Sequence, residues 1–171
     1  MNKKILEIND MLEVYHQCKE LLDQKQNILL FLDIDDTVLS SEIGKKVVDK
    51  NIRLLIELIY RQNPEHLFFL TARESDLNRK TLNQLNNAKL VHDGKFIRYK
   101  IIHSPYDKQN NVYVATKGKT LMRFLQSNSL ISDSDSIWIV FVDDDVQQII
   151  SVKQCLDELP NINYTLYHFL P

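Results

Sequence analysis

The segment from 28 to 40, ILLFLDIDDTVLS, constrains the fold more than any other part of the chain. Five consecutive apolar residues lead directly into Asp33-Ile34-Asp35-Asp36-Thr37. A short, unbroken apolar run that ends in turn-forming acids is typical of a strand buried on both faces. We therefore expect Asp33 at the carboxyl end of a central strand, which is the edge of an open α/β sheet where ligands bind.

Asp33 and Asp35 are two residues apart, so in an extended segment their side chains point the same way. Two carboxylates about 4 Å apart repel by roughly 4 kcal/mol at an effective dielectric constant near 20. The pair therefore predicts a cation between them. The alternative is a simple acidic turn in which Asp35 or Asp36 caps a helix.

Two further apolar runs also end in polar residues. Leu67-Phe68-Phe69-Leu70 is followed by Thr71, and the run from 137 to 142 is followed by Asp143-Asp144-Asp145. Parallel strands place such ends along one edge of the sheet, so four carboxylates are expected to converge there. This acidic cluster needs a divalent cation that prefers oxygen ligands, and Mg²⁺ is favoured.

The rest of the chain alternates helical and strand patterns. Apolar periodicity predicts helices over 9–25, 47–61, 75–87 and 146–158, another that opens at Thr116 or Gly118, and strands over 95–103, 111–116 and 162–168. The alternation predicts an α/β fold with a mostly parallel sheet covered on both faces. The turn residues from 104 to 110 predict a small hairpin between the strands 95–103 and 111–116. No domain boundary is visible, so residues 1–171 are expected to form one domain, with a structural helix at its amino end.

Composition excludes several classes of function. The chain has 171 residues and a net charge of -2, which gives no basis for nucleic-acid binding through bulk charge. Its apolar runs are too short to cross a bilayer, and its first residues lack the apolar stretch of a secretory signal. Cys18 and Cys155 have no metal or redox spacing. With only three glycines there is no Gly-rich phosphate loop, so phosphate binding has to use side chains or a helix terminus.

The residue types at the predicted edge suit a phosphoryl group. The metal and Lys117 would neutralise charge, and Thr71 would hydrogen-bond a phosphoryl oxygen. Asp33 is placed to attack phosphorus, and Asp35 to move a proton to the leaving oxygen. Lys119 is the alternative to Lys117.

Other polar residues near these motifs have simpler expected roles. Arg73 could reach a substrate anion, Thr37 is expected to hydrogen-bond its own turn, and Asp145 is expected to cap the following helix.

The order of these motifs resembles the haloacid dehalogenase (HAD) superfamily, and its phosphatases in particular. The resemblance rests on Asp33-Ile34-Asp35-Asp36-Thr37, on LFFLTAR with Thr71, on Lys117-Gly118, and on VFVDDD with Asp143 and Asp144. It implies a three-layer Rossmann-like domain, Asp33 as the nucleophile and Asp35 as the acid and base. It also implies Mg²⁺ surrounded by Asp33, the backbone carbonyl of Asp35, and the two acids Asp143 and Asp144, of which either could bind the metal directly.

The resemblance extends to small capless members from intracellular bacteria, some of which are secreted effectors that act on phosphoproteins. The intervals from Asp33 to Thr71 and from Thr71 to Lys117 are too short for a cap domain, so the site should be open. The loop 104–111 and the segment 40–46 are its expected walls. The resemblance implies a soluble protein of the bacterial cytoplasm or one secreted into a host cell.

We expect a Mg²⁺-dependent phosphomonoesterase that acts on a phosphoprotein, with phosphotyrosine admitted by an open, shallow site. Two alternatives are a small-metabolite phosphatase and a catalytically silent module that binds phosphate. A receiver-type signalling domain also uses acids, Thr and Lys. However, it has its paired acids first and its accepting Asp later, which is the reverse of the order here.

Overall fold

The computed structural model describes residues 2–41, 46–90, 100–104, 106–107, 112–113, 115–130 and 137–171. Its main feature is a six-stranded sheet in the order β1-β8-β7-β2-β3-β4, in which every neighbouring pair is parallel. The α/β class with a parallel sheet is therefore confirmed.

The strands and helices have the following bounds. The strands are β1 (Lys3–Ile8), β2 (Asn27–Leu32), β3 (Leu67–Thr71), β4 (Lys100–His103), β5 (Tyr106–Asp107), β6 (Val112–Tyr113), β7 (Ile137–Asp143) and β8 (Asn163–Phe169). The helices are α1 (Met11–Asp23), α2 (Ile52–Gln62), α3 (Asn78–Asn87), α4 (Lys117–Ser127) and α5 (Val146–Asp157), with short 3₁₀ turns η1 (Pro64–His66) and η2 (Ser75–Leu77).

The three apolar runs form the centre of the sheet. All residues of β3 and β7, and all of β2 except its first, are buried. Side chains of β2 alternate between two cores, with Leu30 and Leu32 on one face and Leu29 and Phe31 on the other. This explains why these segments are continuously apolar rather than alternating.

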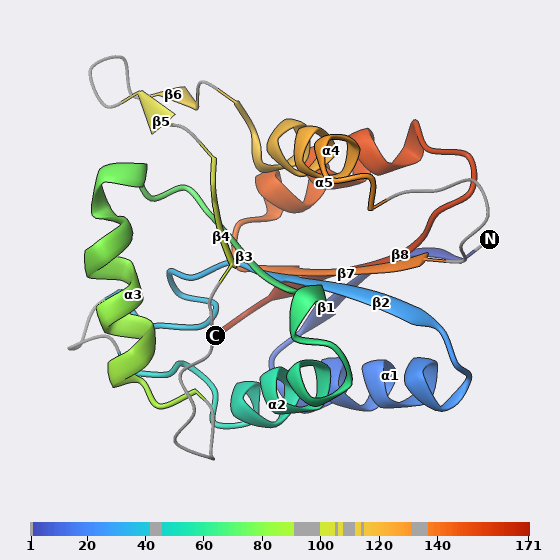
Figure 1. The fold of residues 1–171 in the computed structure, drawn as a ribbon, viewed down its shortest axis with the longest axis horizontal. Coiled ribbons are helices and arrows are strands. Elements are labelled where there is room, and N and C mark those ends of the chain that lie inside the picture. Colours follow the sequence, from blue (N-terminus) through green and yellow to red (C-terminus); the bar gives the residue numbers. More distant parts are fainter. Residues whose placement is uncertain are drawn as a thin grey trace.

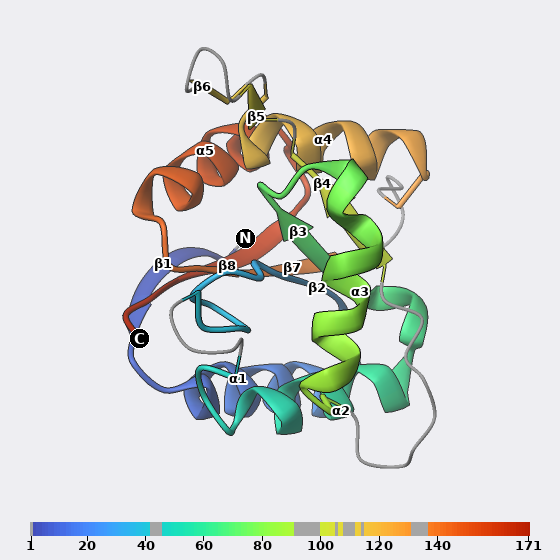
Figure 2. The same cartoon turned by 90° about the vertical axis from the view of Figure 1, so that its left-hand side faces the viewer.

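Helices cover both faces of this sheet, as Figure 1 shows with α1 and α2 below it and α4 and α5 above it. The lower core contains Val14 and Cys18 of α1 with Leu55 and Ile59 of α2. The upper core is built in the same way from α4 and α5. Helix α3 lies beside the carboxyl ends of the strands instead (Figures 1 and 2).

The order of the strands creates a switch point between β2 and β7. From β2 the chain crosses to β3 through α2 on one face, and from β7 it crosses to β8 through α5 on the other face. The crevice between the carboxyl ends of two such strands is where ligands bind in open α/β sheets. Asp33 and Asp143 lie at this point.

Two strand predictions need correction. The strand β1 was not expected, because only Ile8 of its six residues is fully buried and the apolar pattern is correspondingly weak. The predicted pairing of 95–103 with 111–116 is wrong, because β4 pairs in parallel with β3 in the main sheet. The α3 segment provides the helical crossover that a parallel strand needs. The hairpin that forms is smaller and joins β5 to β6.

Helix boundaries also differ from those predicted. Helix α2 begins at Ile52, five residues later than expected, because Val47 forms a bridge with Leu39 instead. In the described residues the intervals between the motifs form α2, α3, β4 and the β5–β6 hairpin, with no cap domain. In the parts of the chain that the structure describes, every helix is too short or too polar to cross a membrane.

Candidate active site

Asp33 and Asp143 are adjacent at the end of neighbouring strands. Leu32 pairs with Val142, and the backbone N–H of Asp33 continues the ladder by donating to the Val142 carbonyl at 2.9 Å. The sheet register therefore brings two residues 110 positions apart in the sequence next to each other. Both are almost completely buried, with exposed fractions of 4% and 1%.

Lys117 lies between these two carboxylates. Its Nζ donates to Asp33 Oδ1 at 2.5 Å and to Asp143 Oδ2 at 2.7 Å. The lysine is the first residue of α4, whose N-cap Thr116 accepts from the backbone N–H of Lys119. The backbone N–H of Lys117 donates to Oε1 of buried Gln148 on α5. Two helices thus fix the ammonium group at the strand ends.

Burial and charge act against each other in this cluster. Burial raises the pKa of Asp33 and of Asp143 above the usual range, even though the Lys117 ammonium favours their charged forms. Burial lowers the pKa of Lys117, but Asp33 and Asp143 raise it by more, so the net shift is upward. Lys117 is therefore charged, and one ammonium incompletely offsets two buried carboxylates.

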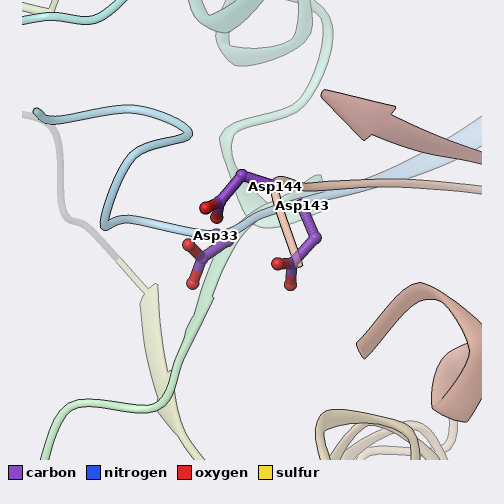
Figure 3. Close-up of side chains that lie close together, drawn as sticks. All are labelled: Asp33, Asp143 and Asp144. Atoms are coloured by element: carbon purple, nitrogen blue, oxygen red, sulfur yellow. The ribbon is translucent and has the colours of Figure 1, made fainter. Parts of the chain in front are cut away.

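Asp144 adds a third carboxylate. One oxygen each from Asp33, Asp143 and Asp144 lie within 4.8 Å of one another, and Figure 3 shows the three side chains together. This separation and this all-oxygen set fit a divalent cation. Both oxygens of Asp143 are already used, by Lys117 Nζ and by the backbone N–H of Asp145.

Asp144 is held by Thr37. The Thr37 hydroxyl accepts from the backbone N–H of Asp144 at 3.0 Å and donates to its Oδ1 at 3.3 Å. Thr37 thus links the first acidic motif to the last, rather than bonding only within its own turn as expected. His168 Nε2 lies 3.1 Å from the Asp144 carbonyl. Among the described residues Thr37 contacts Oδ1 of Asp144, which leaves Oδ2 as the oxygen that could face a metal ion.

Asp35 has a cation of its own. Arg73 donates from Nη2 to Asp35 Oδ1 at 2.6 Å and from Nε to Oδ2 at 2.7 Å, which is a bidentate ion pair. The guanidinium also reaches Thr81 and Gln84 on α3. Asp33 contacts Lys117 and Asp35 contacts Arg73, so each acid has a protein cation of its own, and a cation shared by the two stays a prediction. Strand β2 ends at Leu32, so the alternation of side chains does not extend to Asp35.

The other predicted site residues also have definite positions. Thr71 is buried at the end of β3, and its Oγ1 accepts from the backbone N–H of Arg73. Lys119, the alternative lysine, is exposed. Asp36 has a left-handed backbone and accepts hydrogen bonds from Ser41. Asp145 caps α5 by accepting from Gln147.

The expected walls of the site fall largely outside the described residues, in 42–45, 105 and 108–111. Within the described chain, sequence reasoning missed Gln148 as the partner of Lys117 and Arg73 as the partner of Asp35. The available clue was a glutamine in the helix that follows the acid motif. Gln148 is buried there, and buried amides have to find partners.

Comparison with known proteins adds a family and a fold. Residues 42–171 match the model of a family described as "Protein of unknown function (DUF2608)". The chain belongs to this family. The match includes Thr71, Lys117 and the acids after β7, and it begins after Asp33 and Asp35. No curated protein matches the chain.

The fold of this family member is similar to that of a HAD domain. The solved HAD domain of effector protein Lem4 from Legionella pneumophila aligns with a TM-score of 0.52 and 12% identity, covering 84% of this chain and 85% of that one. An inactive mutant of the same domain aligns with a TM-score of 0.51 and 12% identity, covering 85% of each chain. At this identity the likeness shows a HAD-like fold.

Proposed function

We propose that this protein is a Mg²⁺-dependent phosphomonoesterase that forms an aspartyl-phosphate on Asp33. The observation that carries the proposal is the contact of one buried lysine with Asp33 and Asp143, at the switch point of a HAD-like sheet. Asp144 lies within ligand distance of both acids. A cluster of two buried carboxylates, one half-buried carboxylate and one buried ammonium is unfavourable for stability alone and is typical of a functional site.

The chemistry follows from these positions. An Asp33 oxygen attacks phosphorus, the bond from phosphorus to the ester oxygen breaks, and the leaving oxygen takes a proton from Asp35. A water then attacks the phosphoryl group while Asp35 accepts its proton. The bond between Asp33 and phosphorus breaks, and inorganic phosphate leaves. Lys117 orients Asp33 and offsets negative charge during both steps.

The acidic cluster would hold the metal. Asp33 and Asp144 are the proposed direct carboxylate ligands, because both oxygens of Asp143 are already hydrogen-bonded. The Asp35 backbone carbonyl is a further proposed ligand. When bound, Mg²⁺ supplies Lewis-acid stabilisation of charge on the phosphoryl oxygens. Thr71, at the end of β3, is the proposed hydroxyl donor to that group.

We further propose a phosphoprotein substrate, with phosphotyrosine among the residues that the site accepts. The support is the absence of a cap domain from the described residues, which leaves the strand ends reachable by a large substrate. The likeness to an effector domain is compatible with secretion. A small-metabolite phosphatase is the alternative, and it predicts faster turnover of metabolites than of phosphopeptides.

The test is hydrolysis of p-nitrophenyl phosphate with Mg²⁺ or with EDTA. Wild type and Asp23→Asn, an exposed control on α1, should turn over only with Mg²⁺. Asp33→Asn should be inactive because the attacking carboxylate is lost. Beryllium fluoride should bind wild type but not Asp33→Asn. Equal activity of Asp33→Asn and wild type would reject the proposal.

A silent phosphate-binding module is the second candidate. The bidentate contact with Arg73 favours it, because both oxygens of the proposed acid and base are engaged. This candidate predicts phosphopeptide binding with no turnover by wild type. The assay above separates the two functions.

A further inference from the structure

A basic groove lies between the start of α2 and the end of α3. It consists of two cavities of about 510 and 410 Å³ that share Lys50, Arg53 and Lys89. Lys46 lines the second cavity, and among the described lining residues of the two Glu57 is the one acid. Four cations and one acid of the described residues therefore face this groove, although the chain has a net charge of -2.

Two carboxylates of the described chain lie near the groove cations: Asp10, which interacts electrostatically with Lys50, and Glu57. Glu57 forms its ion pair with Arg61, on the next turn of α2. Arg53 donates from Nη2 to the Ala88 carbonyl at 3.0 Å, which joins α2 to the end of α3 without a carboxylate. The first turn of α2 contains no acid, although helix N-termini favour negative charge. An anion bound in the groove would gain from the positive end of the α2 dipole and from the basic side chains.

The groove lies on the same side of the molecule as the proposed active site. The start of α2 and the lower end of α3 both lie toward the carboxyl ends of the strands (Figures 1 and 2). The Lys46 carbonyl accepts from Ser40, and Leu39 bridges to Val47, so the rim of the groove is tied to the loop after Asp35. A chain bound at Asp33 can continue past this loop toward the groove.

The lining is partly apolar as well as basic. Leu54 is 46% exposed, and the buried Leu90 also lines the larger cavity. A concave surface with both properties suits an extended peptide that has acidic and apolar side chains. A bilayer is a flat surface, which a groove meets poorly. The negative net charge of the chain disfavours a nucleic acid.

We infer that this groove binds an acidic peptide segment that flanks the phosphorylated residue of the substrate. The inference rests on the proposed phosphatase function, and it specifies the substrate class as phosphoproteins with acidic residues near the phosphate. Long-range attraction between the basic groove and an acidic segment also makes their association faster than association with a neutral segment.

The test compares two phosphopeptides of roughly ten residues, one with flanking Asp and Glu and one with Ala at those positions. The double charge reversal Lys50→Glu/Lys89→Glu should lower kcat/KM for the acidic peptide relative to the neutral one by about tenfold or more. The control Lys4→Glu/Lys19→Glu makes the same charge change at exposed positions on β1 and α1 and should keep the ratio. An unchanged ratio in the groove variant overturns the inference.

A binding measurement keeps the inference testable if no phosphate ester is hydrolysed. Fluorescence anisotropy with the unphosphorylated acidic peptide should show binding to wild type that weakens between about 0.05 and 0.3 M KCl. The groove variant should bind about tenfold more weakly than the Lys4/Lys19 control. Equal binding by both variants overturns the inference, as does binding to anionic vesicles without binding to the peptide.

Discussion

Lys117 is a buried cation that two buried carboxylates share. Its Nζ contacts two carboxylates whose exposed fractions are below 5%, and its own exposure is 3%. Removing the lysine would leave two buried acids without their shared cation, which typically destabilises a protein by about 3–5 kcal/mol. Lys117 also favours the charged form of Asp33, which the proposed nucleophilic attack on a phosphate requires.

Arg73 is expected to position Asp35. Replacement by Met removes both hydrogen bonds to the carboxylate and should lower kcat for p-nitrophenyl phosphate by about tenfold, a fraction of what general acid–base catalysis contributes. Arg73→Lys should restore little of this activity, because a single ammonium cannot reproduce the planar two-point contact. Steady-state kinetics provides the measurement.

Two comparisons make the Arg73 result specific. Arg79→Met changes an exposed arginine on the same helix that anchors Arg73, and it should leave kcat close to that of wild type. In an Asp35→Asn background the Arg73→Met change should have almost no further effect. A rise in kcat for Arg73→Met would mean that the arginine restrains Asp35 rather than positioning it.

At the scale of elements, α4 and α5 approach so closely that only glycine fits between them. A Cβ at Gly118 would lie 2.1 Å from the Ser151 carbonyl oxygen. Alanine normally favours a helix over glycine by about 1 kcal/mol, but here overpacking should reverse the sign and destabilise by about 1–3 kcal/mol or more. Gly118→Ala should therefore lower Tm by several degrees in thermal unfolding, at about 2–4 °C per kcal/mol.

Lys119→Ala is the matched control for this change. It lies one residue further along the same helix, is exposed, and should leave Tm nearly unchanged. Gly118→Ala should also reduce the proposed phosphatase activity, because Lys117 is its neighbour and would move with the start of α4. A Gly118→Ala protein as stable as wild type would contradict the contact between these helices.

Asp157 joins three elements at the opposite end of the sheet. It accepts hydrogen bonds from Lys153 of α5 and Tyr164 of β8. Its Oδ1 also lies 3.5 Å from Nζ of Lys3 on β1. These contacts, led by the Lys153 hydrogen bond, lower its pKa to about 2. The folded-state pKa is below the unfolded value, so this contribution to stability is present above about pH 4 and is lost as the pH falls toward 2.

Asp157→Asn should accordingly lower Tm by roughly 1–3 °C near neutral pH, the range for partly exposed ion pairs in a chain of this size. The difference from wild type should shrink between about pH 4 and pH 2, where wild-type Asp157 also becomes neutral. Thermal unfolding of both proteins over that pH range is the measurement. A difference that grows on acidification would contradict the assigned direction of the pKa shift.

The elements also show what sequence could reveal. The central strands were predictable because burial on both faces leaves a continuous apolar run, and the polar residues after each run marked the edge where the acidic cluster lies. The edge strands β1 and β4 were harder, since half-exposed residues give no clear period. The Arg73–Asp35 pair depends on where the chain turns after Leu32, which local patterns do not specify.

At the scale of the whole molecule, the fold joins distant parts of the chain at one point. Asp33 belongs to the first fifth of the sequence, whereas Asp143 and Asp144 come near its end. Their convergence requires that β2 pairs with β7, which places β3 and β4 on the far side of β2. An ion held by these acids would therefore bind the folded state and not the unfolded chain.

Mg²⁺ should accordingly stabilise the whole protein through this single site. At a concentration about 100-fold above Kd, exclusive binding to the folded state adds about 2.7 kcal/mol, which corresponds to a Tm increase of roughly 5–10 °C. EDTA should reverse the shift. Asp144→Asn should lose most of it while remaining stable without metal, since its Oδ1 contact with the Thr37 hydroxyl is a long one at 3.3 Å and an amide oxygen can replace it.

Asp143→Asn provides the contrasting case. The amide that replaces the carboxylate has one acceptor oxygen for two donors, Lys117 Nζ and the backbone N–H of Asp145, so Tm should fall even without metal. Because Asp143 is not the proposed direct ligand, the variant should retain more of the Mg²⁺ shift than Asp144→Asn does. The reverse ranking would exchange the roles of the two acids, and a full shift in both variants would place the ion elsewhere.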